Sequence, residues 1–117
     1  MADFIIEKKN FDMEKLSIEL NEYSKLKNLD NNDFTKLQLV TEEYLTNILF
    51  PNFEGAVEIS ISDDDKELAI VFSHKGIDYM NKITDEAFLS LKILDNKTKE
   101  IHSSVTEGIT SVKFVIN

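Results

Sequence analysis

The chain has 117 residues, which is enough for one domain with its own hydrophobic core and too few for two. It contains no cysteine, which excludes disulfides and thiolate metal sites. Its 22 acidic and 13 basic residues give a net charge of −9, which disfavours nucleic acid and anionic membranes as partners. Because the N-terminus resembles no secretory leader and the apolar stretches are short, we expect a cytoplasmic protein.

The first half of the chain predicts one strand and two helices. Residues 4–6 are apolar between polar flanks, as in a short strand. A helix is expected to open at residues 10–12, and a second to run from about Asp33 to Leu49, where Pro51 ends it. Apolar residues recur at helical spacing on both, at Leu16, Leu20 and Tyr23 and at Leu37, Val40, Tyr44 and Ile48.

The second half predicts mainly strands. Apolar and polar residues alternate over 57–61 and 68–72, which indicates a hairpin with its turn at 63–66. A loop around Gly76 follows, and Thr84 before two acidic residues is a good helix start. That helix should end near residues 96–97, and two further strands are expected at 101–105 and 109–116.

The order is therefore strand, helix, helix, strand, strand, helix, strand, strand. Clustered helices of this kind favour an α+β fold, with the helices on one face of a mixed sheet. No linker or repeat divides residues 1–117, so we expect a single domain.

The pair Glu43 and Asn47 stands out on the second predicted helix. The two residues are four positions apart, so their side chains point the same way, one turn apart. A carboxylate beside a carboxamide can hold a hydrated cation and offer a base, which suits phosphoryl transfer if a nucleotide pocket is present. The alternative is that both are solvated residues of a helix face.

The element order, together with residues 39–47 on the second helix, resembles the GHKL ATPase superfamily, which includes gyrase, MutL and the histidine kinases. Within it, the chain is most similar to the anti-sigma factor serine kinases of the RsbW and SpoIIAB type. The resemblance implies a two-layer sandwich with a mostly antiparallel sheet of about five strands and three helices on one face. It also implies that Glu43 is the general base and that Asn47 binds Mg²⁺.

The same resemblance implies that Asn47, His74, Gly76 and Thr110 contact Mg-ATP. The stretch 73–79 stands where the family has an Asp-x-Gly loop whose aspartate accepts a hydrogen bond from adenine. Gly76 is retained, but His74 occupies the aspartate position, and neutral histidine accepts one hydrogen bond without a carboxylate's charge. An ordinary histidine at the end of a strand is the alternative for His74.

A second departure concerns the glycine-rich loop that cradles phosphates in the family. Residues 80–91 contain no glycine, and Ser90 stands where one is expected. Asp85 and Glu86 would repel phosphates at this place. The sequence therefore predicts a degraded nucleotide site.

Three functions are compatible with these patterns. The first is an anti-sigma-like regulatory domain that binds a protein partner, either a sigma factor or a small anti-anti-sigma domain; the resemblance also implies a homodimer. The second is an active ATP-dependent serine kinase with Glu43 as base and Asn47 on Mg²⁺. The third is a binding module that shares the architecture but has no sigma-related role.

Overall fold

The computed structural model describes residues 3–64, 67–82 and 85–117. The regular elements in chain order are β1 (Phe4–Glu7), η1 (Lys8–Asn10), α1 (Met13–Leu26), α2 (Asn31–Glu43), η2 (Tyr44–Leu49), β2 (Ala56–Asp64), β3 (Glu67–Lys75), η3 (Tyr79–Lys82), η4 (Asp85–Ala87), α3 (Phe88–Lys97), β4 (Glu100–Thr106) and β5 (Ile109–Val115). Here η2 is π-helical, whereas η1, η3 and η4 are 3₁₀ turns.

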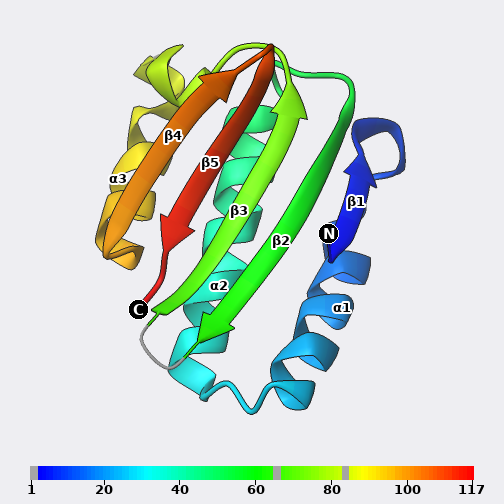
Figure 1. The fold of residues 1–117 in the computed structure, drawn as a ribbon, viewed down its shortest axis with the longest axis vertical. Helices are drawn as coiled ribbons and strands as arrows, with labels where there is room; N and C mark the ends of the chain where they lie inside the picture. The colour runs from blue at the N-terminus through cyan, green and yellow to red at the C-terminus, as the bar shows by residue number, and fades with distance from the viewer. Residues whose placement is uncertain (1–2, 65–66, 83–84) are drawn as a thin grey trace.

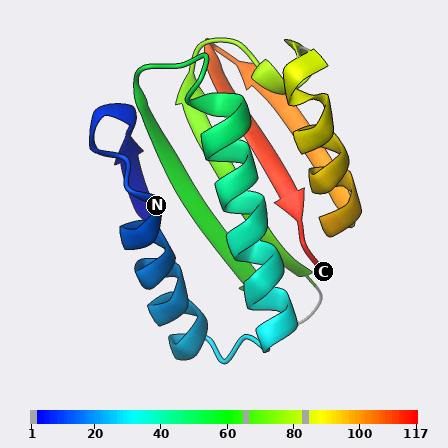
Figure 2. The ribbon, with the colours of Figure 1, turned by 180° about the vertical axis from the view of Figure 1, so that it is seen from behind.

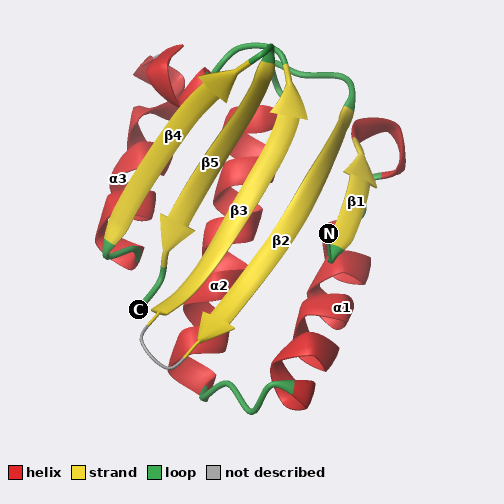
Figure 3. Cartoon of the chain, in the orientation of Figure 1, coloured by secondary structure: helices red, strands yellow, loops and turns green. Residues whose placement is uncertain are grey.

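The strands form one five-stranded sheet in the order β1-β2-β3-β5-β4 (Figures 1 and 3). All four pairings between these strands are antiparallel. The three α-helices cover a single face of the sheet, as the view from behind shows (Figure 2). The predicted α+β two-layer sandwich is confirmed, with a sheet that is antiparallel throughout rather than mixed.

Aspartates set the starts of the first two helices. Asp12 Oδ1 accepts hydrogen bonds from the backbone N–H groups of Glu14 and Lys15, at 3.0 and 3.3 Å, and so caps α1. Asp30 Oδ1 accepts from the N–H of Asp33 at 2.8 Å, which explains why α2 begins two residues before the predicted start.

The second predicted helix changes its winding near its end. It is α-helical to Glu43 and π-helical from Tyr44 to Leu49, where the N–H of Phe50 donates to the carbonyl of Leu45, five residues back, at 3.0 Å. Pro51 follows directly, in agreement with the predicted end.

Two further predicted boundaries differ from the structure. The hairpin strand β3 continues to Lys75, so the loop around Gly76 starts later than predicted and contains the short turn η3. The third helix, expected from Thr84, has its regular α-helical turns only from Phe88. Thr84 itself, and Asp65 and Lys66 of the predicted turn, lie outside the described residues.

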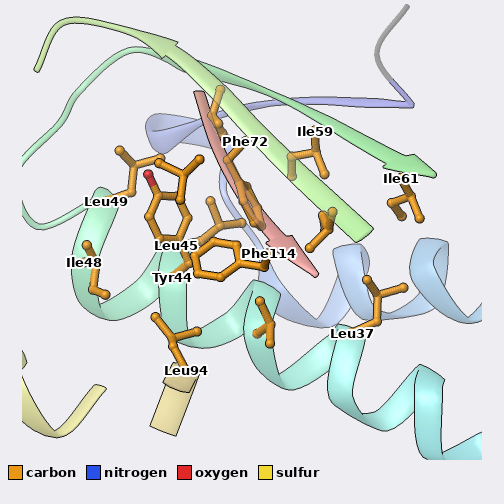
Figure 4. Close-up of a cluster of buried hydrophobic side chains, with 14 of the residues drawn as sticks. Leu37, Tyr44, Leu45, Ile48, Leu49, Ile59, Ile61, Phe72, Leu94 and Phe114 are labelled. Carbon is orange, nitrogen blue, oxygen red and sulfur yellow. The ribbon is translucent and has the colours of Figure 1, made fainter. Parts of the chain in front are cut away.

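The core fills the space between the sheet and α2 (Figure 4). The ring of Tyr44 packs against those of Phe72 and Phe114, with centroids 4.7 and 5.4 Å apart. The apolar face predicted for the second helix is fully buried, at Leu37, Val40, Tyr44 and Ile48. Among the described residues, the model has no helix with the length and apolar character needed to cross a membrane.

Candidate functional site

Glu43 and Asn47 lie at the junction between α2 and η2. Asn47 Nδ2 donates a hydrogen bond to Glu43 Oε2 at 2.9 Å, so the predicted base and the predicted magnesium ligand contact each other. Glu43 is half-buried and Asn47 is exposed. The bond leaves the amide oxygen of Asn47 available, which is the atom that a magnesium ion would need.

His74, Gly76 and Thr110 come together where β3 ends. His74 lies opposite Thr110 in the pairing of β3 with β5. Thr110 Oγ1 donates to the carbonyl oxygen of Gly76 at 2.6 Å, and the N–H of Gly76 donates to the carbonyl of Gly108 at 2.8 Å. Gly76 has φ +101°, a conformation that other residues rarely adopt, so this turn requires glycine.

The ring of His74 is enclosed by the chain's own aromatic side chains. His74 is only 3 % exposed. The ring of Phe53 lies 4.8 Å from it, and the ring of Tyr79 stacks on it at 5.9 Å with an interplanar angle of 24°. At the position where the family resemblance places adenine, the histidine therefore packs against two rings of this chain.

The one hydrogen bond that the His74 ring forms with the described residues, from Nδ1, identifies the tautomer of the neutral ring. Its Nδ1 lies 2.8 Å from the carbonyl oxygen of Lys75, and since a carbonyl only accepts, Nδ1 carries the hydrogen. Nε2 is then an acceptor, and it is buried without a hydrogen-bond partner among the described residues. An unpaired buried acceptor is costly, so this atom is the natural place for a water or a ligand group.

Gly55 allows Phe53 to take this position. A Cβ built on Gly55 would lie 2.7 Å from Cζ of Phe53, closer than real contacts allow. Phe53 therefore folds back over the backbone of Gly55 and reaches His74 from the segment between η2 and β2. A side chain at position 55 would displace the ring.

Two buried polar groups beside this cluster were missed by the sequence analysis, and Asp78 is the first of them. Asp78 is 7 % exposed, and its carboxylate accepts from the N–H of Met80 at 2.9 Å and from Nδ2 of Asn81 at 3.1 Å. These bonds cap the short turn η3. The proximity of Asp78 to Gly76 in the sequence was the available signal, although it did not reveal burial.

The second missed group is the hydroxyl of Tyr44. It is buried without a hydrogen-bond partner among the described residues. Burial raises the pKa of Tyr44 far above its ordinary value, and the charges of Asp78 and Tyr79 add to this effect. Helical periodicity marked Tyr44 as core, which is correct for its ring, but periodicity carries no information about an unpaired hydroxyl.

Two cavities lie away from the predicted site residues. One, of about 400 Å³, is formed by β1 and the first half of α1. The other, of about 490 Å³, lies between α1 and α2 and includes Glu42 but not Glu43. In the described part of the chain, no three histidine or carboxylate side chains gather as a metal site would require.

No protein-family model matches this chain, and no curated protein matches it either. The likeness to GHKL ATPases therefore remains a resemblance carried by the element order and residues 39–47.

Proposed function

We propose that this chain is a regulatory domain of the anti-sigma serine kinase type that acts by binding a protein partner and does not turn over ATP. The enclosure of His74 by Phe53 and Tyr79 carries this proposal. The expected partner is a sigma factor or a small anti-anti-sigma domain in bacterial transcription or stress signalling.

The first support comes from the adenine position. Adenine would have to displace the ring of Phe53 from His74, and it would then meet one uncharged acceptor in place of a carboxylate. Hydrogen bonds to a charged group are roughly twice as strong as those to a neutral one. Adenine would thus be held weakly after removal of a well-packed ring.

The second support comes from the phosphate side. Residues 80–91 lack the glycines that let backbone N–H groups approach phosphates, and Ser90 is buried. Asp85 is exposed at the beginning of η4 and adds negative charge where phosphates would lie. Asn47 could still offer its amide oxygen to Mg²⁺, but a single neutral ligand does not hold this ion.

Thermal melting with and without about 5 mM Mg-ATP tests the proposal. We expect no change in Tm. A ligand at about 100 times its Kd stabilises by about 2.7 kcal/mol, which would raise the Tm of a domain of this size by roughly 10 °C. Such a rise would contradict the proposal and favour the active kinase.

In that case two variants separate binding from transfer. Asn47→Ala should abolish the Tm rise, since it removes the magnesium ligand. Glu43→Ala should keep the rise and stop phosphate transfer to a serine of the partner. If neither variant has its effect, the site lies elsewhere.

The partner is tested by co-purification of the tagged chain from its native host. Recovery of a sigma factor or an anti-anti-sigma domain supports the regulatory role. Recovery of unrelated proteins alone would favour a binding module that merely shares the architecture. Sedimentation velocity tests the homodimer that the resemblance implies.

A further inference from the structure

A groove runs between α1 and α2 on the helical side of the molecule. The two helices lie side by side and run in opposite directions (Figures 1 and 2), and the cavity of about 490 Å³ described above lies between them. Its lining comes from the first half of α1 and the second half of α2 and consists of Met13, Glu14, Ser17, Ile18, Gln38 and Glu42. Because Glu43 and Asn47 do not line it, the groove is separate from the residues considered for phosphoryl transfer.

Two apolar side chains contribute surface to this groove. Met13 is half-buried and packs against the core, whereas Ile18 is 61 % exposed in the middle of α1. A β-branched residue at an exposed helical position gives the helix no local advantage, since straight-chain residues have higher helix propensity. Ile18 therefore offers apolar surface that neither the helix nor the core requires.

Both walls of the groove carry a carboxylate. Glu14 on α1 and Glu42 on α2 are exposed, and the lining includes no lysine, arginine or histidine. Neither carboxylate forms an ion pair with another described residue. The groove thus combines apolar surface with two negative charges that the described part of the chain leaves uncompensated.

The charges around the groove have the same sign. Residues 12–43 hold eight acidic residues and four lysines, so this span is net −4. Lys15 lines the cavity between β1 and α1 instead. Lys25 lies on the same face of α1 as Ile18 but two turns further along, beyond the residues of the lining. Counting the neighbouring charges therefore leaves the groove negative.

The groove offers no open backbone to a partner. Its residues belong to two helices, whose N–H and C=O groups bond within each helix. Even the first N–H groups of α1 are used, because the side chain and carbonyl of Asp12 accept from Glu14, Lys15 and Leu16. An extended segment would find no backbone partners here, whereas a helix satisfies its own backbone and packs through its side chains.

We propose that the groove between α1 and α2 binds an amphipathic, basic helix of a partner protein. An apolar side chain of that helix would pack on Met13 and Ile18. Lysine or arginine side chains one turn to either side would meet Glu14 and Glu42. Residues three or four positions apart lie on one face of a helix, so the apolar and the basic contacts are made by the same face.

The charge of the groove disfavours other macromolecules. A second copy bound through the same face in a two-fold dimer would bring Glu14 and Glu42 of both chains together, with no cation in either lining. Nucleic acid and anionic membranes carry negative charge themselves. A polypeptide with positive charge is the occupant that complements this surface.

The test uses a fluorescein-labelled peptide of about 14 residues, long enough to form a helix, made of leucine, lysine and alanine with the leucines and lysines on one helical face. It is titrated by fluorescence polarisation up to about 1 mM, in about 50 mM salt. We expect saturable binding. A peptide of the same composition with leucine and lysine spread around the helix, and one with glutamate for lysine, should each bind at least about tenfold more weakly. No binding of the first peptide, or equal binding of the spread peptide, would overturn the proposal.

Two charge reversals locate the basic contact. Glu42→Lys should weaken binding of the first peptide about fivefold, because it replaces an attraction by a repulsion. Glu58→Lys makes the same change at an exposed position of β2, on the face of the sheet away from the helices, and it should leave binding nearly unchanged. Both variants shift the net charge from −9 to −7, since each replaces one negative charge by one positive charge. Equal loss in both would show that the peptide responds to net charge alone and would contradict the proposal.

Two further variants locate the apolar contact. Ile18→Gln should weaken binding about fivefold, because it removes apolar surface from the groove. Leu26→Gln makes a similar change on the same helix, at a residue that is 83 % exposed and does not line the groove, and it should leave binding unchanged. Both variants should keep the Tm of the unchanged chain, because both side chains are exposed. Unchanged binding in Ile18→Gln would contradict the proposal.

Sedimentation velocity tests whether a second copy occupies the groove instead. We expect the same oligomeric state for the unchanged chain and for Ile18→Gln. Loss of self-association in Ile18→Gln would show that a second copy binds there and would contradict the proposal. Helix binding in this groove does not depend on the regulatory role proposed above, because Mg-ATP melting leaves the groove untested and the peptide titration involves neither nucleotide nor a sigma factor.

Discussion

The His74 cluster, formed by Phe53, His74 and Tyr79, contrasts with the edge formed by α3 and β4. The cluster is where the family resemblance predicts a ligand, and the chain's own rings fill it. The α3–β4 edge carries no motif, and it is where backbone and apolar side chains remain open. A sequence motif gives the residue types at a position. Whether those residues are free to bind a ligand depends on which other side chains pack against them.

The largest expected effect is the loss of core packing at Tyr44, whose hydroxyl lies beside the cluster. Tyr44→Ala should lower the free energy of unfolding by about 3–5 kcal/mol, because the ring contacts Phe72 and Phe114 in a filled core. Phe88→Ala, at the open edge, should change it by less than about 0.5 kcal/mol. Urea denaturation of both variants measures the difference, and similar costs would mean that the edge is packed after all.

The second prediction tests whether position 55 requires glycine only because a side chain there would collide with the ring of Phe53. Gly55→Ala should cost about 1–3 kcal/mol, because the new methyl group meets the ring at 2.7 Å. In a Phe53→Ala background the same change should cost less than about 0.5 kcal/mol, since the obstructing ring is gone. The matching double-mutant cycle is measured by urea denaturation. A cost that persists without the ring would assign Gly55 a backbone role instead.

Periodicity predicted most of the fold from the sequence. The alternation at 57–61 and 68–72 identified β2 and β3, and the stripe on residues 37–48 identified the buried face of the second helix. The π-helical turn from Tyr44 was not predicted, because over only six residues the apolar positions 44, 45, 48 and 49 fit either an α-helical or a π-helical winding.

The candidate site was predicted only in part. Local sequence brought together Glu43 with Asn47 and indicated the turn at Gly76. The packing of Phe53 on His74 joins residues 21 positions apart through a fold in the chain at Gly55. Tertiary contacts of this kind leave no periodic signal in the sequence. The enclosure of the His74 ring by Phe53 and Tyr79 could therefore be recognised only from the structure.

The third prediction concerns the unpaired hydroxyl of Tyr44. Tyr44→Phe should raise the free energy of unfolding by about 1 kcal/mol near pH 8, because it removes a buried hydroxyl without a described partner. Decreased stability would show instead that the hydroxyl has a partner, such as a water shared with His74. Urea denaturation at pH 8 measures the difference.

The same variant should alter stability at high pH. Because burial raises the pKa of Tyr44 above the ordinary 10.0, the folded chain keeps this proton while the unfolded chain loses it. Stability is therefore retained below pH 10 and falls above it, by up to about 1.4 kcal/mol per pH unit from this group. Tyr44→Phe should remove this part of the slope between pH 10 and 11, and an unchanged slope would contradict the raised pKa.

The smallest effect is expected from Glu100 and His102 at the open edge. The hydrogen bond from His102 lowers the pKa of Glu100 below its ordinary value, and the charge of His102 adds to this. Glu100 should therefore favour the folded state above its ordinary pKa and lose that contribution as the pH falls through the lowered one. His102→Gln should raise the pKa of Glu100 toward its ordinary value, as measured by carboxyl NMR titration.

His102→Gln should change the pKa of Glu100 without changing the stability of the folded chain. Both side chains of the pair are more than half exposed, so water screens their interaction and the free energy of unfolding near pH 7 should stay constant within error. A clear loss of stability would show that the pair is shielded from water, and hence that something covers β4 in the isolated chain. That outcome would remove the contrast between the filled cluster and the open edge, because the contrast requires β4 to be uncovered.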